Sequence, residues 1–301
     1  VYERARNSDC RIAFAEGDQL RVLQAVEHIA REKLGYPILF GRPDEIKRQI
    51  KQNGLSIRED KDFEIAYDID ENRYADCYHR ILARRGISRE EALSHVRASP
   101  TLQAALMVKT GDADTMLCGV IGRFHHHLRR IIHVSEQPEG EQQISTMALH
   151  LTSSGSYFVC DTRVMFEPTA EDIVRLTLTA AKEVERFGIK PRVALLSHSN
   201  FGDRDSPSSL KMRRARQMLL QQAPELECDG EMQMDSALSE QRRKMRFSGA
   251  SISGSANLLV MPNLKFRAST PNRLERKSVE EAFAKSVLYG FPILEKDNTG
   301  K

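Results

Sequence analysis

The chain has 301 residues, 40% of them apolar and 29% charged, and its formal net charge is +3. This composition excludes an intrinsically disordered chain, and so small a net charge argues against a dedicated nucleic-acid-binding protein. Five dispersed cysteines without a CxxC pair indicate reduced thiols in a cytoplasmic protein. No apolar run reaches membrane-spanning length and no signal peptide opens the sequence, so we expect no membrane segment. Because the chain begins at Val1 rather than Met, we interpret it as a fragment of a longer protein.

Strands and helices alternate over the first fifty residues. A strand with a tight turn is predicted at 11–17, a helix over Arg21–Lys33, a second strand at 37–41 and a second helix over Pro43–Asn53. Short connections between such elements predict a parallel, doubly wound sheet. Glu16 and Gly17 close the first strand, where open sheets present polar groups, although a turn role is the simpler interpretation of Gly17.

The next stretch is helical and leads to three consecutive histidines. Helices are predicted over Asn72–Gly86 and Thr101–Thr110, the first with a glycine C-cap. Arg84 and Arg85 lie in its last turn, where cations offset the helix dipole. Histidines 125–127 lack the spacing of metal ligands, because adjacent helical positions point about 100° apart and ligand pairs need i, i+3 or i, i+4 spacing. We therefore predict no metal site.

A strand, a polar loop and the start of a helix meet between residues 193 and 216. Val193–Leu196 is typical of a buried parallel strand, and Ser206 and Pro207 are placed as N-cap and N1 of the next helix. Free backbone N–H groups and the helix dipole favour an anion at such a corner. The loop adds donors at Ser197, Ser199 and Asn200, and the helix adds Lys211, Arg213, Arg214 and Arg216. An ordinary strand-to-helix connection with a solvated basic helix face is an equal alternative.

Two further residues are candidates by position or by type. Asp161 lies at the C-terminal end of the predicted strand that begins at Tyr157, and residues of a cleft collect at such strand ends. Capping or bracing of a loop would explain an aspartate at this position as well. His198 has the residue type of a general base, but a loop histidine bonded to backbone is the commoner case.

Six ordered blocks of sequence between residue 3 and Leu264 form a recognisable series. They are RIAFAEGD at 11–18, GDAD at 111–114 with HHLRR at 126–130, CDT at 160–162 with EPTAE at 167–171, LLSHSNFG at 195–202, CDGE at 228–231 and MPNL at 261–264. The series resembles the phosphotransacetylase family. The pattern GRFHHH at 122–127 is similar to the branch of that family found in bacterial NADP-dependent malic enzymes.

The resemblance implies an α/β fold with two lobes. It is a sandwich of parallel and mixed sheets of the phosphotransacetylase type, related to the fold of isocitrate dehydrogenases. We expect residues 1–135 to form the first lobe and 136–264 the second, with a cleft between them. The segment 265–301 departs from the family pattern, and no placement is predicted for it. The resemblance also implies a homodimer or a larger homo-oligomer.

The resemblance implies a site for acetyl-CoA or CoA and for phosphate. Arg129 matches an arginine that faces the substrate phosphate in the family. Together with the loop and strand-end residues, it gives seven expected binding residues: Arg129, Asp161, Ser197, His198, Ser199, Asn200 and Lys211. No catalytic residue is predicted, because the segment that supplies serine, arginine and aspartate for acetyl transfer in the family has no clear match. In the nearest stretch, 272–281, Glu275 stands in place of the serine.

Our leading hypothesis is a regulatory domain of a malic enzyme. It would bind acetyl-CoA and signal its occupancy to a catalytic domain that this chain lacks, where NADP and a divalent metal would bind. An active phosphate acetyltransferase is the first alternative. A structural dimerisation module with a vestigial cleft is the second.

Overall fold

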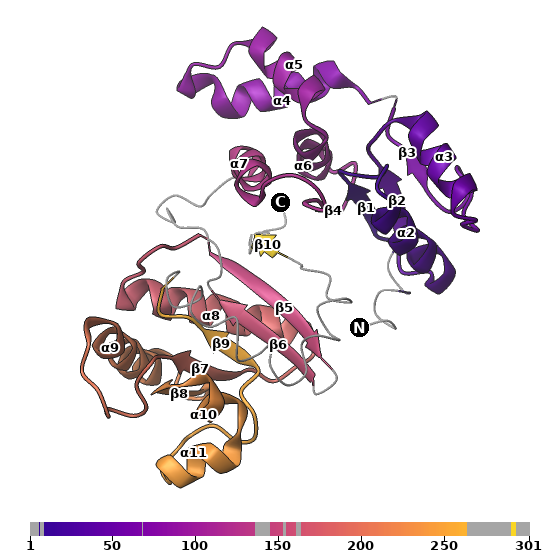
Figure 1. Cartoon of the computed structure of the whole chain (residues 1–301). Coiled ribbons are helices and arrows are strands. Elements are labelled where there is room, and N and C mark those ends of the chain that lie inside the picture. Colours follow the sequence, from indigo (N-terminus) through magenta and orange to yellow (C-terminus); the bar gives the residue numbers. More distant parts are fainter. Residues whose placement is uncertain are drawn as a thin grey trace. The chain divides into compact units, whose positions relative to one another are not determined.

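The computed structural model describes residues 6, 9–67, 69–135, 145–152, 155–160 and 164–263, and the backbone of 290–292. The chain divides into two compact units, Val1–Pro138 and Glu139–Lys301 (Figure 1). Each unit has its own sheet and its own hydrophobic core. None of the helices in the described ranges is long and apolar enough to cross a membrane.

The described part of the first unit is built on a four-stranded parallel sheet. Its strands are β1 (Arg11–Phe14), β2 (Tyr36–Leu39), β3 (Glu64–Ile65) and β4 (Thr115–Leu117). The order across the sheet is β3-β2-β1-β4, and Ala13 of β1 pairs with Ile38 of β2. The first strand therefore has neighbours on both sides, as in the doubly wound parallel sheet that the sequence predicts.

The helices of the first unit agree well with the sequence pattern. They are α2 (Leu20–Glu32), α3 (Pro43–Gln52), α4 (Glu71–Leu82), the 3-10 helix η1 (Ala83–Arg85), α5 (Arg89–Ala98), α6 (Pro100–Thr110) and α7 (Phe124–Val134). The helix predicted to end at Gly86 consists of α4 and η1, and Gly86 has the left-handed conformation of a C-cap. α5 is not among the predicted helices, although Ser88 and Glu91 form a capping box at its start.

The sheet of the first unit is buried on both faces. Ala13 and Ile38 belong to a hydrophobic cluster with residues of α4, α5 and α6. The next residues along the strands, Phe14 and Leu39, belong to another cluster with residues of α2 and α3. Successive strand residues point to opposite faces, so helices cover both sides of this sheet.

The second unit contains a mixed sheet, of which six strands lie in the described residues. They are β5 (Thr146–Thr152), β6 (Gly155–Cys160), β7 (Arg192–Leu196), β8 (Glu227–Met232), β9 (Leu258–Val260) and β10 (Gly290–Pro292). The order is β10-β5-β6-β9-β7-β8; β10, β5 and β6 are antiparallel, whereas β6, β9, β7 and β8 run parallel. The α/β fold with parallel and mixed sheets is confirmed.

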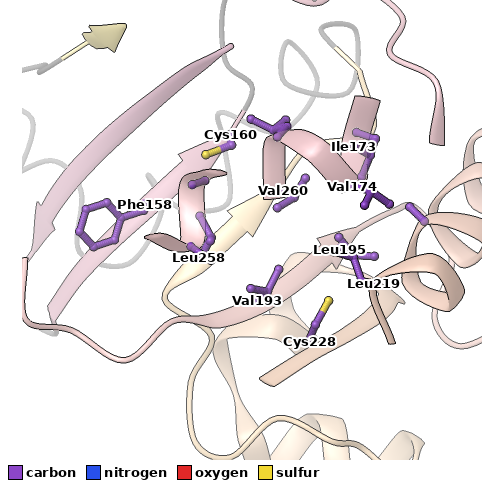
Figure 2. Close-up of a cluster of buried hydrophobic side chains, with 14 of the residues drawn as sticks. Phe158, Cys160, Ile173, Val174, Val193, Leu195, Leu219, Cys228, Leu258 and Val260 are labelled. Carbon is purple, nitrogen blue, oxygen red and sulfur yellow. The ribbon is translucent and has the colours of Figure 1, made fainter. Parts of the chain in front are cut away.

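The helices of the second unit are α8 (Ala170–Arg186), α9 (Pro207–Gln222), α10 (Met234–Leu238) and α11 (Glu240–Arg246). Figure 2 shows the cluster in which Val193 and Leu195 of β7 pack with Ile173 of α8 and Leu219 of α9. The N-cap of α8 is Thr169, whose hydroxyl accepts from the N–H of Asp172. Pro168 therefore lies before the cap, outside the helix.

Candidate functional site

The predicted polar loop follows β7 directly and is largely buried. Ser197 and Ser199 are 1% and 0% exposed and Asn200 is 6% exposed, whereas the side chain of His198 is exposed. β7 lies between β9 and β8, and the N–H of Ser197 still donates to the carbonyl of Met232 on β8. Buried hydroxyl and amide groups at this position need partners inside the protein.

Glu231 of β8 provides the central partner of this loop. Its side chain is fully buried. Oε1 accepts from the Ser199 hydroxyl at 2.8 Å and from the Gly202 N–H at 3.0 Å. Oε2 accepts from Nε of Arg213 at 3.0 Å. Three donors and one opposite charge compensate the burial of this carboxylate. The sequence placed Glu231 in a family block but assigned it no role.

A second carboxylate also contacts the Ser199 hydroxyl. Oδ1 of Asp203 lies 2.7 Å from Oγ of Ser199 and accepts from the N–H of Asn200 at 2.8 Å. The bond to Ser199, followed by the bond from Asn200, lowers the pKa of Asp203. A serine has one hydroxyl hydrogen, so Ser199 donates to one of the two carboxylates at a time. Its oxygen also accepts from the N–H of Arg204 at 3.2 Å. We call Ser199, Gly202, Asp203, Arg213 and Glu231 the Glu231 network.

The backbone N–H groups of the loop are used within the chain. Each N–H from residue 199 to residue 204 donates to an acceptor of the same chain. Ser199 donates to Oγ of Ser197, Asn200 to Oδ1 of Asp203, Phe201 to the carbonyl of Glu231, Gly202 to Oε1 of Glu231, Asp203 to the carbonyl of Asn200, and Arg204 to Oγ of Ser199. At the start of α9, Oγ of Ser206 accepts from the Ser209 N–H at 3.1 Å and Pro207 is N1, so the predicted cap is confirmed. The expectation of free N–H groups is wrong for these loop residues.

The basic residues of α9 face carboxylates. The pairs are Lys211 with Glu167 at 2.8 Å, Arg213 with Asp205 at 2.7 Å and with Glu231, Arg214 with Glu171 at 2.6 Å, and Arg216 with Asp229 at 2.9 Å. Asp229 and Glu231 are fully buried, so Arg213 and Arg216 neutralise charges inside the second unit. The positive charge that the sequence places at this helix is therefore largely cancelled within the protein.

One donor of the loop has no partner among the described residues. Oδ1 of Asn200 accepts from the N–H of Gln233 at 2.9 Å, and Nε2 of Gln233 donates to the carbonyl of His198 at 2.8 Å. Nδ2 of Asn200 is buried and makes no hydrogen bond within the described structure. A buried unpaired donor costs free energy, which an acceptor on a ligand would recover.

The other predicted binding residues do not join this network. Arg129 is an exposed residue of α7 in the first unit. Asp161 lies outside the described residues. Lys211, whose side chain is 13% exposed, is held by Glu167. The structure thus brings Ser197, Ser199 and Asn200 together, and a shared site with Arg129 stays a prediction.

A buried glutamate fixes the chain before α7 in the first unit. Glu16 is 8% exposed and accepts from the Gly119 N–H at 2.9 Å and 3.1 Å. Burial raises the pKa of this carboxyl, and the Gly119 N–H opposes the rise. Nδ1 of His127 lies 3.7 Å from Oε1 of Glu16. Glu16 therefore does more than close the first strand, since it holds the segment that follows β4.

The three consecutive histidines differ in how far their side chains are exposed. His125 and His126 are exposed, whereas His127 is partly buried and contacts Oγ1 of Thr101 at 2.9 Å and the carbonyl of Ile121 at 2.7 Å. These contacts make His127 a bracing residue between α7, α6 and the preceding loop. Within the described ranges, no three His, Cys, Asp or Glu side chains are grouped so that they could hold a metal ion.

Comparison with known proteins identifies the family. Residues 1–272 match the model of the phosphate acetyl/butaryl transferase family. The chain belongs to this family. It is 41% identical over 293 residues to the NADP-dependent malic enzyme of Escherichia coli (strain K12), with 96% of this chain and 39% of that protein covered. It is 44% identical over 268 residues to the NAD-dependent malic enzyme of Rhizobium meliloti (strain 1021), with 88% and 35% covered.

The chain spans less than two fifths of the length of these two relatives. Its fold is similar to that of a phosphotransacetylase from Streptococcus pyogenes, with a TM-score of 0.78 and 24% identity. That similarity covers 91% of this chain and 84% of the other, and it concerns the fold alone. The family resemblance and the phosphotransacetylase type of fold predicted from the sequence are both confirmed.

Proposed function

We propose that this chain is the phosphotransacetylase-like domain of a malic enzyme and that it binds acetyl-CoA as a regulatory ligand. The observation that carries the proposal is the 41% identity to the Escherichia coli NADP-dependent malic enzyme, which extends over 96% of this chain and 39% of that protein. A match to one part of a longer enzyme fits a domain that acts on a catalytic partner domain. The nicotinamide cofactor and a divalent metal would bind in that partner domain.

The Glu231 network supports binding rather than turnover. A transition state for acyl transfer is stabilised by donors that are free to meet the developing charge. The Ser199 hydroxyl and the Arg213 guanidinium are instead held by carboxylates of the protein. Burial raises the pKa of the nearby strand thiol Cys228 to about 12, so it supplies no thiolate near neutral pH. Nδ2 of Asn200, on the same loop, makes no hydrogen bond within the described structure and could donate to a ligand.

Regulation requires more than binding. Acetyl-CoA changes the activity of a catalytic domain only if it binds two states of the assembly with different affinities. The alternative function, phosphate acetyl transfer within this chain, is compatible with the match of residues 1–272 to the transferase family but is not favoured by it. The two functions differ in whether bound acetyl-CoA releases a free thiol.

The test measures both properties on one sample of the purified chain. Calorimetry reports the binding of acetyl-CoA, and a thiol reagent reports coenzyme A released in the presence of phosphate. We expect saturable binding without sustained thiol release. Sustained release would establish the transferase instead, and absence of binding would refute both ligand-based functions.

A pair of variants tests the assigned arginine. Arg129→Gln should weaken binding of acetyl-CoA by roughly 10- to 100-fold, because a charge-assisted hydrogen bond to phosphate contributes about 1.5–3 kcal/mol. The matched control is Arg123→Gln, since both arginines are exposed and both lie at or in α7. Equal weakening by the two substitutions would show a general charge effect and would remove Arg129 from the site.

A further inference from the structure

The polar loop after β7 contacts the segment of α10 and α11 at two points. The N–H of Gln233, which precedes α10, donates to Oδ1 of Asn200 at 2.9 Å, and Nε2 of Gln233 donates to the carbonyl of His198 at 2.8 Å. The ring of Phe201 stacks on the ring of Phe247, the residue after α11, with centroids 4.5 Å apart and planes 25° apart. The loop therefore touches both ends of the segment that contains the two helices.

A buried arginine ties α10, α11 and the chain that follows them into one body. Arg243 of α11 is fully buried, and its guanidinium donates to four carbonyls. Nη1 donates to Ser236 and Ala237 of α10 at 2.9 Å and 3.2 Å, and Nη2 donates to Ile252 and Gly254 at 3.0 Å and 2.5 Å. A guanidinium removed from water needs such acceptors. A shift of α10 is therefore passed on to α11.

α11 and the residue after it present apolar side chains to solvent. Met245 is 75% exposed and Phe247 is 38% exposed. In the described ranges, no other large apolar residue is as exposed as Met245. Met245 and Lys244 line an open depression on this helix. We call Met245 and Phe247 the α11 face.

The charges around the α11 face are balanced within the chain. Three basic residues of α11 each have an acidic neighbour: Arg242 pairs with Asp235 at 3.2 Å, Lys244 pairs with Glu240 at 2.9 Å, and Arg246 acts electrostatically on Asp203. Nucleic acids and anionic membranes are bound through basic residues whose charge is free to meet phosphate. The α11 face therefore fits an apolar protein surface better than either of these partners.

The rest of the relatives' sequences provides a candidate for the surface that covers the α11 face. The match to the two malic enzymes leaves more than three fifths of the length of each outside this chain. A domain tethered in the same polypeptide acts at a high effective concentration, so a small apolar face is enough to bind it.

We propose that the α11 face binds the catalytic domain of the malic enzyme and that a ligand on the polar loop changes this contact by moving α10 and α11. This inference rests on the proposed function and names the surface through which the regulation acts. The two arrangements of α10 and α11 are the two states that acetyl-CoA binds with different affinities.

The movement begins at Asn200. Its Nδ2 is buried without a hydrogen-bond partner among the described residues, and its Oδ1 holds the N–H of Gln233. A ligand oxygen that accepts from Nδ2 reorients this amide and so changes the bond that holds the start of α10. Phe201, the next residue, has φ 48°, a left-handed conformation that costs free energy for a residue with a Cβ. Release of this strain favours the second arrangement, in which the Phe201 ring shifts against Phe247.

The first experiment compares two substitutions in the purified chain. Met245→Glu places a charge on the α11 face. Leu220→Glu is the matched control, because Leu220 of α9 is an exposed apolar residue of the same unit, at 40%. Both variants should bind acetyl-CoA within about twofold of the unmodified chain, since neither side chain belongs to the polar loop.

The same two substitutions are then made in the longer malic enzyme of the proposed function. Allosteric ligands typically act by a factor of about 5 to 150, and Met245→Glu should reduce the effect of acetyl-CoA on malate oxidation to less than about twofold. Leu220→Glu should keep the full effect. A full effect in Met245→Glu would overturn the inference.

A second measurement needs no variant. Hydrogen exchange of the purified chain should change in α10 and α11 when acetyl-CoA binds, and not only in the loop. Unchanged exchange over residues 233–247 with acetyl-CoA bound would show that the loop does not move these helices, and the inference would fail.

Light scattering identifies a different occupant of the α11 face. The mass of the purified chain in solution should be the same for Met245→Glu and for the unmodified chain. A lower mass of the variant would assign the α11 face to a contact between copies of this chain and would overturn the inference.

The proposed function and this inference fail in different ways. If acetyl-CoA does not bind the purified chain, or has no effect on the unmodified longer enzyme, the proposed function fails and the inference fails with it. If acetyl-CoA binds and regulates the unmodified enzyme and Met245→Glu equally, the proposed function stands and the inference alone fails.

Discussion

The Glu231 network of the second unit and the arginines around His133 of α7 in the first unit differ in how their positive charge is balanced. In the second unit, Arg213 faces a fully buried carboxylate and a second acidic residue on the loop. In the first unit, Arg129 and Arg130 have no carboxylate partner among the described residues and act together on His133. A basic residue beside a polar loop can thus be a structural counter-charge, whereas Arg129 and Arg130 are not neutralised by a carboxylate among the described residues.

The largest expected effect comes from breaking the buried ion pair. Arg213→Met keeps much of the side-chain volume and leaves Glu231 without its counter-charge. We expect the free energy of unfolding to fall by about 3 kcal/mol, near the lower end for buried pairs because Arg213 is 30% exposed. Urea denaturation measures the loss.

The matched control is an exposed pair on the same helix. Arg214 and Glu171 are 68% and 53% exposed, so Arg214→Met should cost no more than about 0.5 kcal/mol. If both substitutions cost the same, the Glu231 network stabilises the loop no better than a surface ion pair does.

The next effect sharpens the comparison by crowding the strand that carries Glu231. Gly230 has φ 138°, and a Cβ at this position would lie 2.6 Å from the Leu195 carbonyl oxygen. Gly230→Ala should therefore lower the free energy of unfolding by about 2 kcal/mol. Gly188→Ala is the control, because its φ is 74° with open space around the Cβ, and it should cost about 1 kcal/mol. Equal costs in thermal or urea unfolding would contradict close approach of β8 to β7.

A smaller effect concerns the pH dependence of stability through His133 of α7, whose Nδ1 lies 3.1 Å from the Tyr78 hydroxyl of α4. Because the folded pKa of His133 is lowered, the unfolded chain binds the extra proton more readily as pH falls below about 6.5. His133→Gln should remove the loss of stability that this proton binding causes. As the pH falls from about 7.5 to about 5.5, the free energy of unfolding of the variant should therefore rise relative to that of the unmodified chain. His126→Gln should show no such improvement. A constant difference across this range would mean that the folded chain does not lower the pKa of His133.

The smallest difference between the two units is expected for their thiols. Burial, followed by the charge of Glu16, raises the pKa of Cys118 to about 12. Burial, followed by the charge of Asp229, raises the pKa of Cys228 to about 12 as well. Neither thiol should react rapidly with iodoacetamide at neutral pH in the folded chain. Mass spectrometry after a short exposure would reveal modification of either residue and contradict this expectation.

Local signals predicted much of the fold. Neighbouring residues were enough to predict the cap of α9, the glycine after η1 and the strand β7. Each of these features depends on hydrogen bonds or on periodicity within a few positions. Gly17 shows the limit of such reasoning. A Cβ there would lie 2.6 Å from Cβ of Leu39, so the position requires glycine for close approach to the second strand.

The candidate site was predicted less well than the fold. The loop serines and Asn200 were identified, but Glu231 and Asp203, which hold them, received no role. His133 and Tyr78 were not singled out either. Their partners come from other elements, as in the contact between residues 78 and 133, and no local pattern marks them.

The sequence by itself determined the family and the alternation of strands and helices, because these depend on ordered motifs and on periodicity along the chain. Only the tertiary structure decided which charges are neutralised. Lys211 meets Glu167 from 44 positions away, and Arg213 meets Glu231 from 18 positions away. Such pairs form only when folding brings residues from different elements together, so the availability of a basic residue for a ligand is a property of the folded chain.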